Sequence, residues 1–410
     1  MFTFTGFVQL ALVKKIYDLS KSTAGVRHKW SWAALAMGNT GGHTGSMRIP
    51  PGNGPHQVGC TDLMVGHTTE GTFLRLFYPC NTHEDSERPE WIPSQEYFNG
   101  LADFMKINRS ISERIFNYLF GLCTQPYVAS WPPKGSLLRL WSIGNESASA
   151  TFYFTENAEA EQQKEQASCK PPSVNPPHLN QQWMYHRPIK PGESEFPLRN
   201  KQVKQRADEC IRALDLLIEI NSGSPVENVL RTQFDFSTLE NCMDLCKIAI
   251  MGHSFGGATV IEGLCKEGKF KCGVALDAWM FPIDEEIFPR VKQPIFFINS
   301  EKFQWVGNIL RIKKLDSAFI PRKMITIRGT VHQSFPDFTF LTGNWLGKLL
   351  KLKGDINPNV AMDLCNKASL AFLQRHLSLE RDFNQWDPLI DGKDDNLIQG
   401  TNITVPQSSI

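Results

Sequence analysis

Short apolar runs, each followed by polar or helical sequence, dominate the chain beyond Lys247. The runs KIAIMG, CGVALDA, PIFFINS and MITIRG are rich in β-branched residues, and a similar run, GTFLRLFYP, occurs much earlier. Continuous apolar runs of this length are typical of parallel strands in a sheet that helices cover on both faces. The pattern therefore predicts an α/β fold with a mostly parallel central sheet.

Two segments have the periodicity of amphipathic helices. Apolar residues recur every three or four positions over residues 97–123 and again over Val203–Ile220. The second helix is expected to end at the Asn-Ser-Gly sequence of residues 221–223, which is a common stop signal. For the first helix, packing in the core is the ordinary explanation and docking on a lipid surface is the alternative.

Changes in composition divide the chain into segments. Residues 20–60 are rich in Gly, His, Pro and Ser, and a later polar stretch contains many prolines. We expect an N-terminal arm over residues 1–60 and one domain over 61–395. A polar insertion is expected at about 155–200, and a C-terminal tail over 396–410.

Charge and cysteine content exclude several classes of function. The chain of 410 residues has 43 Lys plus Arg against 42 Asp plus Glu, a formal net charge of +1, so no broad basic surface is expected to bind nucleic acid. The ten cysteines are scattered, and Cys242 and Cys246 have no second pair at ligand spacing, so we expect buried thiols and no metal site.

The N-terminus gives no clear targeting signal. The apolar stretch at residues 1–13 lacks a basic start and a cleavage site, is too short to span a bilayer, and has no Gly after Met1 for myristoylation. Glycosylation sequons at Asn108, Asn145 and Asn402 would permit, without requiring, an extracellular protein. An extracellular and a cytoplasmic location therefore both stay open on these grounds.

The sequence Gly252-His253-Ser254-Phe255-Gly256 follows the strand KIAIM and opens an apolar helical stretch. A G-x-S-x-G motif between a strand and a helix is the signature of a nucleophile elbow. Glycines flank the serine because the turn is too tight for side chains there, and the helix N-terminus favours developing negative charge. The pattern predicts an α/β-hydrolase-type serine esterase whose nucleophile is Ser254.

A serine hydroxyl needs a base, and the base needs an acid that fixes its tautomer. In this fold the order along the chain is serine, acid, histidine. Asp277 ends the strand CGVAL, and His332 follows the later strand MITIRG, so the two residues come after Ser254 in the required order. Glu301, after PIFFINS, is the alternative acid, and we favour Asp277.

The stretches GHSFGGATVI, CGVALDAWMFP, QPIFFINSE and MITIRGTVHQSFPDFTFLTG resemble the plasma-type platelet-activating-factor acetylhydrolases, and the similarity runs from about Ile49 to Asn402. The resemblance implies a secreted, calcium-independent serine esterase without a cofactor. It would remove acetyl or short, oxidised acyl chains from the sn-2 position of phospholipids at a lipoprotein or membrane surface.

The resemblance also assigns roles to residues. Ser254, Asp277 and His332 match the triad, and Phe255 matches a backbone donor of the oxyanion hole. The positions near the substrate pocket are Trp279, Gln333 and Phe335. A general carboxylesterase or lipase is the alternative enzyme. A catalytically silent binder of lipoprotein or membrane surfaces is the alternative outside enzymes, with Ile111–Phe120 and Thr342–Gly354 as the apolar and basic segments that would dock.

One segment departs from the family. Members carry a strand that ends in a Ser-His-Gly-type loop, then a helix and another strand, where this chain has only WPPKGSLLRLWSIGNE over Trp131–Glu146. A strand-helix-strand unit needs roughly 30 residues, so we expect one or two strands, a helix and the loop with the second oxyanion donor to be missing. The neighbouring strands would then be left unpaired. We expect either a splice variant, or a gene model with a skipped exon and a shifted reading frame across SLLRLWSIG.

Overall fold

The computed structural model describes the greater part of the chain from Ile49 onward. The described residues are 49–50, 57–66, 71–80, 99, 102, 108–109, 137–142, 148–153, 189–230, 232, 234–341, 344–349 and 351–404.

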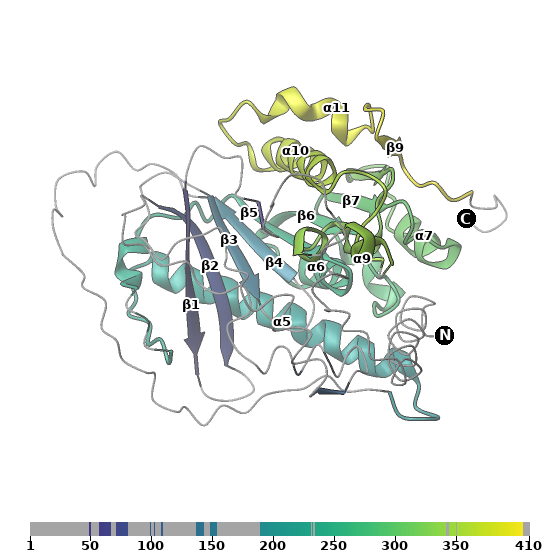
Figure 1. Ribbon diagram of the computed structural model, residues 1–410. Helices are drawn as coiled ribbons and strands as arrows, with labels where there is room; N and C mark the ends of the chain where they lie inside the picture. Colours follow the sequence, from purple (N-terminus) through teal and green to yellow (C-terminus); the bar gives the residue numbers. More distant parts are fainter. Residues whose placement is uncertain are drawn as a thin grey trace, which may run out of the picture.

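A nine-stranded sheet lies at the centre of the described structure, and its strands are ordered as they occur in the chain (Figure 1). The strands are β1 (Gln57–Val65), β2 (Thr72–Cys80), β3 (Leu137–Ser142), β4 (Ala148–Tyr153), β5 (Ile248–His253), β6 (Phe270–Leu276), β7 (Ile295–Ser300), β8 (Arg322–Ile327) and β9 (Leu397–Gln399).

Strand direction follows the expected α/β pattern. Strands β5 to β8 pair in parallel, and the pairs on both sides of them are antiparallel. Because antiparallel pairing alternates, β1 and β3 also run in the direction of β5, and only β2, β4 and β9 run the other way. The prediction of a mostly parallel sheet within an α/β-hydrolase type of fold is confirmed, and the parallel part is the part that carries the site.

The shortened segment is accommodated by a β-hairpin, which corrects one expectation. We expected unpaired strands beside the gap, but β3 pairs with β2, and β4 pairs with both β3 and β5. The physical reason is connection length. Parallel neighbours need a crossover of a dozen or more residues, whereas antiparallel neighbours need only a short turn, and five residues separate Ser142 from Ala148. The sheet therefore stays continuous.

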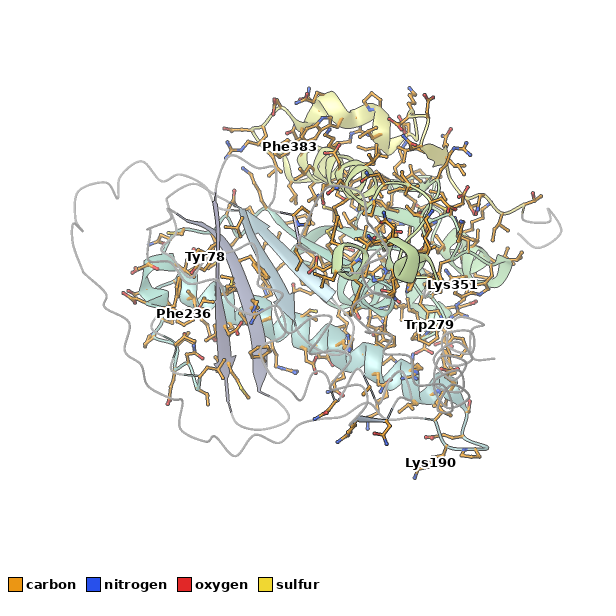
Figure 2. The ribbon with its side chains drawn as sticks, in the orientation of Figure 1. Tyr78, Lys190, Phe236, Trp279, Lys351 and Phe383 are labelled. Carbon is orange, nitrogen blue, oxygen red and sulfur yellow. The ribbon has the colours of Figure 1, made fainter. Side chains whose placement is uncertain are left out.

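Helices cover both faces of the sheet (Figure 1), and side chains fill the space between the layers (Figure 2). The α-helices are α5 (Glu195–Asn221), α6 (Phe255–Lys266), α7 (Val306–Lys313), α8 (Phe338–Leu341), α9 (Asn344–Leu349), α10 (Pro358–Leu377) and α11 (Asp387–Ile390). Short 3-10 helices are η1 (Phe236–Leu239), η2 (Glu285–Arg290), η3 (His332–Ser334) and η4 (Phe383–Trp386).

Successive residues of the central strands enter two different hydrophobic cores. Ile295 and Phe297 of β7 pack with α5, α6 and α7, while Phe296 and Ile298 pack with α10 and α11. Side chains alternate between the faces of a strand, so a strand with helices on both sides must be apolar throughout. This explains why all six residues of β7 are buried and why the apolar runs were continuous.

Helix boundaries were partly predictable. The helix expected over Val203–Ile220 is α5, which ends at Asn221 and is followed by Gly223 with a φ of 79°. It begins at Glu195, eight residues before the expected start and inside the stretch taken as a polar insertion. None of the residues 195–202 is buried, and Val203 is the first buried residue of the helix, so the pattern marked only the part that enters the core.

Two segment boundaries need correction. Strand β1 starts at Gln57, inside the expected N-terminal arm, and pairs with β2 along its whole length. Strand β9 lies inside the expected C-terminal tail and pairs with β8, and Thr326 Oγ donates a hydrogen bond of 2.8 Å to the Gly400 carbonyl. Both edge strands depend on a partner across the sheet, which local composition does not reveal.

Some expectations fall outside the described residues. The helix expected over residues 97–123, apart from residues 99, 102 and 108–109, and residues 155–188 of the insertion are among these, so both stay predictions. Within the described part of the chain, no helix is both long enough and apolar enough to cross a membrane.

The two-core arrangement predicts how substitutions on α10 affect stability. Phe372 is fully buried and stacks on Phe296, with ring centroids 5.2 Å apart, whereas Val360 on the same helix is 42% exposed. We expect Phe372→Ala to lower the free energy of unfolding by about 3–5 kcal/mol and Val360→Ala to change it by less than about 0.5 kcal/mol. Urea unfolding measures both. Equal effects of the two substitutions would contradict the assignment of this face to a core.

Candidate active site

The nucleophile elbow lies between β5 and α6, at the carboxyl end of the parallel strands. Ser254 has φ 60° and ψ −117°, a conformation that non-glycine residues rarely adopt. A Cβ on Gly252 would lie 2.2 Å from the Gly256 carbonyl oxygen, so this position requires glycine. Hydrogen bonds from Ser254 N to the Leu276 carbonyl (2.9 Å) and from Trp279 N to the Ser254 carbonyl (3.0 Å) hold the turn.

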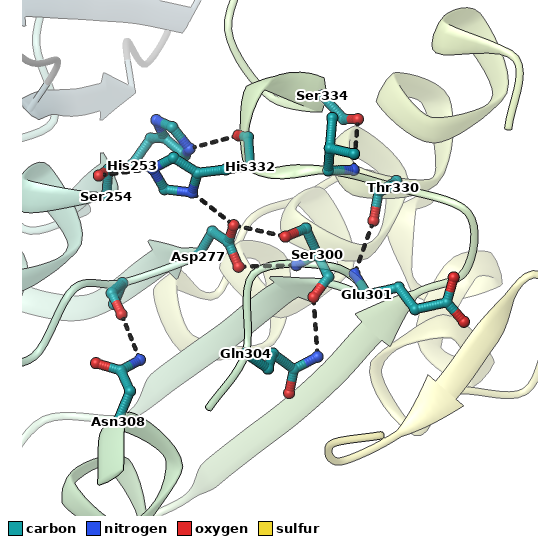
Figure 3. Close-up of polar contacts among 12 residues, drawn as sticks. His253, Ser254, Asp277, Ser300, Glu301, Gln304, Asn308, Thr330, His332 and Ser334 are labelled. Atoms are coloured by element: carbon teal, nitrogen blue, oxygen red, sulfur yellow. Dashed lines mark hydrogen bonds and ion pairs between the residues drawn. The ribbon is translucent and has the colours of Figure 1, made fainter. Parts of the chain in front are cut away.

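His332 reaches Ser254 from the loop after β8 (Figure 3). Its Nε2 lies 2.8 Å from Ser254 Oγ, and its Nδ1 lies 2.7 Å from Asp277 Oδ2. A carboxylate only accepts hydrogen bonds, so in neutral His332 the proton is on Nδ1 and Nε2 has a free lone pair toward the serine hydroxyl. This geometry lets the imidazole take the proton from Ser254.

Asp277 directly follows β6 and is almost completely buried, with 2% of its surface exposed. Its backbone φ of 47° turns the chain sharply at the strand end. The carboxylate accepts three hydrogen bonds: Oδ2 from His332 and from Ser300 Oγ (2.6 Å), and Oδ1 from Ser300 N (2.9 Å). A buried charge needs such partners, and these fix the plane of the carboxylate.

The structure shows which of the two candidate acids, Asp277 or Glu301, contacts His332. Asp277 contacts His332, whereas the carboxylate of Glu301 accepts a hydrogen bond of 2.7 Å from Gly329 N. Glu301 also donates its own N–H to Thr330 Oγ. Glu301 thus holds the loop that leads to His332 and does not occupy the position of the acid.

The remaining residues expected at the site lie in three different environments. Phe255 begins α6, so its N–H is at the helix N-terminus beside Ser254, and its ring lies 6.0 Å from that of Trp279. Gln333 follows His332 in η3 and is partly buried. Phe335 is buried in the core on the α10 side, and its ring lies 5.7 Å from that of His253. Trp279 is therefore beside the elbow, whereas Phe335 packs behind it.

Sequence reasoning missed two contributors. Ser300 gives both of its donors to Asp277, and its position at the end of β7, next to the strand of the acid, was the available signal. Phe303 stacks on the His332 imidazole with ring centroids 3.7 Å apart and an interplanar angle of 26°. Its place in the chain, soon after a strand end, gave no comparable signal.

The donor set also bears on metal binding. Ligand atoms of His253, Asp277 and His332 lie within 4.8 Å of one another, the one such group among the described residues. Asp277 and His332 hydrogen-bond each other, and His332 also faces Ser254. The lone pairs that would hold an ion are thus already engaged within a proton-transfer chain, and we assign the group to that chemistry.

Comparison with known proteins gives one family. Residues 41–137 and 142–397 match the family described as platelet-activating factor acetylhydrolase, isoform II. The platelet-activating factor acetylhydrolase of Gallus gallus is 48% identical over 403 residues, covering 90% of this chain and 93% of the relative. That of Canis lupus familiaris is 46% identical over 391 residues, covering 87% and 84%. Among solved structures, a ferulic acid esterase from Streptomyces cinnamoneus aligns with a TM-score of 0.51 at 11% identity, covering 86% of this chain and 98% of that chain.

The comparisons also bear on the shortened segment. The family match is interrupted at residues 138–141, inside β3. Ninety per cent of a 410-residue chain is fewer residues than the 403 aligned positions, so the Gallus gallus protein has residues that lack a counterpart here. Both observations agree with a unit that this chain lacks.

The two hydrogen bonds from Ser300 predict a specific loss on substitution. In Ser300→Ala the hydroxyl donor to Asp277 Oδ2 is removed. A hydrogen bond to a charged group contributes about 1.5–3 kcal/mol, so the rate at which a fluorophosphonate labels Ser254 should fall by roughly tenfold to a hundredfold. Ser369→Ala is the matched control, because that serine is also buried but its hydroxyl has no hydrogen-bond partner among the described residues. An unchanged labelling rate in Ser300→Ala would contradict a role in holding Asp277.

The surroundings of His253 predict a dependence of stability on pH. Burial, and secondly the neighbouring His332, hold the pKa of His253 well below its usual 6.5. Below pH 6.5 the unfolded chain therefore takes up a proton at this residue that the folded chain does not. The free energy of unfolding should fall as pH decreases from 7 to 5, and His253→Gln should show a smaller fall. Denaturant unfolding at several pH values tests this, and parallel curves for the two proteins would contradict it.

Proposed function

The chain belongs to the platelet-activating factor acetylhydrolase, isoform II, family, and from this membership we propose that it hydrolyses the sn-2 acetyl ester of platelet-activating factor and short or oxidised acyl esters of related phospholipids. The observation that carries the proposal is the hydrogen-bonded chain from Ser254 through His332 to Asp277. An acyl ester is the substrate class that such a chain serves.

The first half-reaction acylates the serine. Ser254 Oγ attacks the sn-2 carbonyl carbon while its proton moves to Nε2 of His332, and the carbonyl oxygen becomes an oxyanion. Asp277 holds the imidazole in the required tautomer and stabilises its positive charge. Collapse of the intermediate breaks the bond between the carbonyl carbon and the glycerol oxygen, which takes the proton from His332 and leaves as the lysophospholipid.

The second half-reaction releases the acid. Water attacks the acyl carbon of the Ser254 ester and gives a proton to His332, and collapse of this intermediate returns that proton to Ser254 Oγ. The short carboxylic acid leaves. Every step uses groups of this chain and water.

Stabilisation of the oxyanion is the step at which this chain differs from its family. The N–H of Phe255, at the start of α6, is in place to act as one donor. The second donor in this fold comes from the loop that the shortened segment replaces. Loss of one oxyanion donor lowers turnover by about a hundredfold to a thousandfold, so we expect this chain to be slower than relatives that have the loop.

We further propose an extracellular protein of lipid metabolism that acts at a lipoprotein or membrane surface. Asn108 and Asn402, both in sequons, have exposed side chains, and Nδ2 of Asn402 donates a hydrogen bond of 2.8 Å to the Glu301 carbonyl. The segment around α9 has the exposed Lys348 and the nearby Lys351 beside apolar sequence, a combination that suits an anionic lipid surface.

Release of acetate from a 1-alkyl-2-acetyl-glycerophosphocholine tests the proposal directly. The purified chain should release acetate in the presence of a calcium chelator, and Ser254→Ala should show only the background rate because the nucleophile is gone. Ser317→Ala, an exposed serine in the loop before β8, is the matched control and should retain full activity.

Two outcomes would overturn the proposal. Hydrolysis of a simple aryl acetate without hydrolysis of the phospholipid would indicate a general carboxylesterase. Binding to liposomes without fluorophosphonate labelling of Ser254 would indicate a silent lipid-surface binder.

A further inference from the structure

His253, the last residue of β5, makes a hydrogen bond that has no role in the proton transfers above. Its Nε2 lies 3.0 Å from the main-chain carbonyl oxygen of His332 (Figure 3). A carbonyl only accepts, so Nε2 of His253 carries the proton and donates. His253 is paired with Leu276 of β6 in the parallel ladder, so its ring projects from the rigid centre of the sheet.

The hydrogen bond from His253 acts on His332, whose position decides whether the imidazole reaches Ser254. Other hydrogen bonds hold the loop on either side of His332: Gly329 N donates to Glu301 Oε2, and Val331 N donates to Ser334 Oγ. The bond from His253 engages the main chain of His332 itself. It therefore ties the backbone of the base to the strand that ends at the nucleophile.

The ring of His253 also contacts the ring of the base. Their centroids lie 4.5 Å apart with an interplanar angle of 36°, and Phe303 stacks on the same imidazole at 3.7 Å and 26°. Phe335 packs against His253, with centroids 5.7 Å apart. Phe303 stacks on the imidazole and His253 packs against it at a tilted angle, and the two rings together restrict its rotation out of the plane that reaches Ser254 and Asp277.

From these contacts we infer that His253 is a positioning residue for the base: its Nε2–H holds the His332 carbonyl, and its ring supports the imidazole in line with Ser254 and Asp277. The inference rests on the proposed function, because it assigns His332 as the base. The residue directly before the nucleophile thus positions the base, His332, which lies 78 positions after Ser254 in the chain.

Three substitutions separate the hydrogen bond from the ring. His253→Gln keeps an N–H donor at the same reach, because its amide nitrogen is as many bonds from the backbone as His Nε2. His253→Phe keeps an aromatic ring and loses the donor. His253→Asn has an amide one bond too short to reach the carbonyl, and it replaces His253→Phe in the test if that variant does not fold.

The experiment compares kcat and KM for acetate release by these variants, with folding checked by thermal unfolding. A displaced base lowers turnover without weakening substrate binding. We therefore expect His253→Phe or His253→Asn to lower kcat by at least about tenfold, with KM within twofold, and His253→Gln to restore most of kcat. Equal kcat in all folded variants, or equal losses in His253→Gln and His253→Phe, would overturn the inference.

Wild-type turnover in the same assay decides the proposed function separately. Should the wild type release no acetate, crystal structures of the variants decide the role of His253. His332 Nε2 should then lie within hydrogen-bond distance of Ser254 Oγ in His253→Gln and out of reach in His253→Phe. An unmoved imidazole in His253→Phe would overturn the inference.

Discussion

One buried carboxylate holds the ends of three neighbouring strands together. Asp277 is 2% exposed and accepts hydrogen bonds from Ser300, at the end of β7, and from His332, in the loop after β8. An uncompensated charge at this depth would cost several kcal/mol, so the donors must stay in place. They stay in place because the register pairs Leu276 with Ile298 and Ser300 with Ile327. The geometry of the site is therefore a consequence of how the sheet is aligned.

The nucleophile depends on the same alignment. The strained backbone of Ser254 is held by hydrogen bonds to Leu276 and Trp279, which lie on either side of Asp277. The segment after Asp277 is in turn fixed by Asn308 of α7, which accepts from Met280 N and donates to the Ala278 carbonyl. A strained backbone conformation persists only where several surrounding contacts hold it in place. Here the hydrogen bonds from the ends of β6 and from α7 provide those contacts.

Local sequence was sufficient to predict the nucleophile elbow, because a G-x-S-x-G motif between a strand and a helix is typical of this tight turn. Chain order placed Asp277 and His332 at strand ends, and the structure brings both to Ser254. Ser300 and Phe303 were missed, and the contacts of His253 with His332 were not foreseen, because each of these side chains acts on a residue of another strand or loop. The starts of β1 and β9 were missed for a related reason, since an edge strand is defined by its partner. Long-range pairing, rather than local preference, separates what could be predicted from what could not.

The hairpin of β3 and β4 shows that continuity of the sheet and completeness of the chemistry are separate requirements. Backbone hydrogen bonds are satisfied by a neighbour of either direction, so an antiparallel hairpin can fill the place between β2 and β5. An oxyanion hole requires a donor at one point in space, and strand direction decides which end of a strand carries the loop there. Because β4 is antiparallel to β5 and its first residue, Ala148, pairs with Gly252, the chain enters β4 beside the elbow. In a parallel strand the chain would leave the strand at that point. The fold can thus be retained while the loop that completes the catalytic machinery is lost.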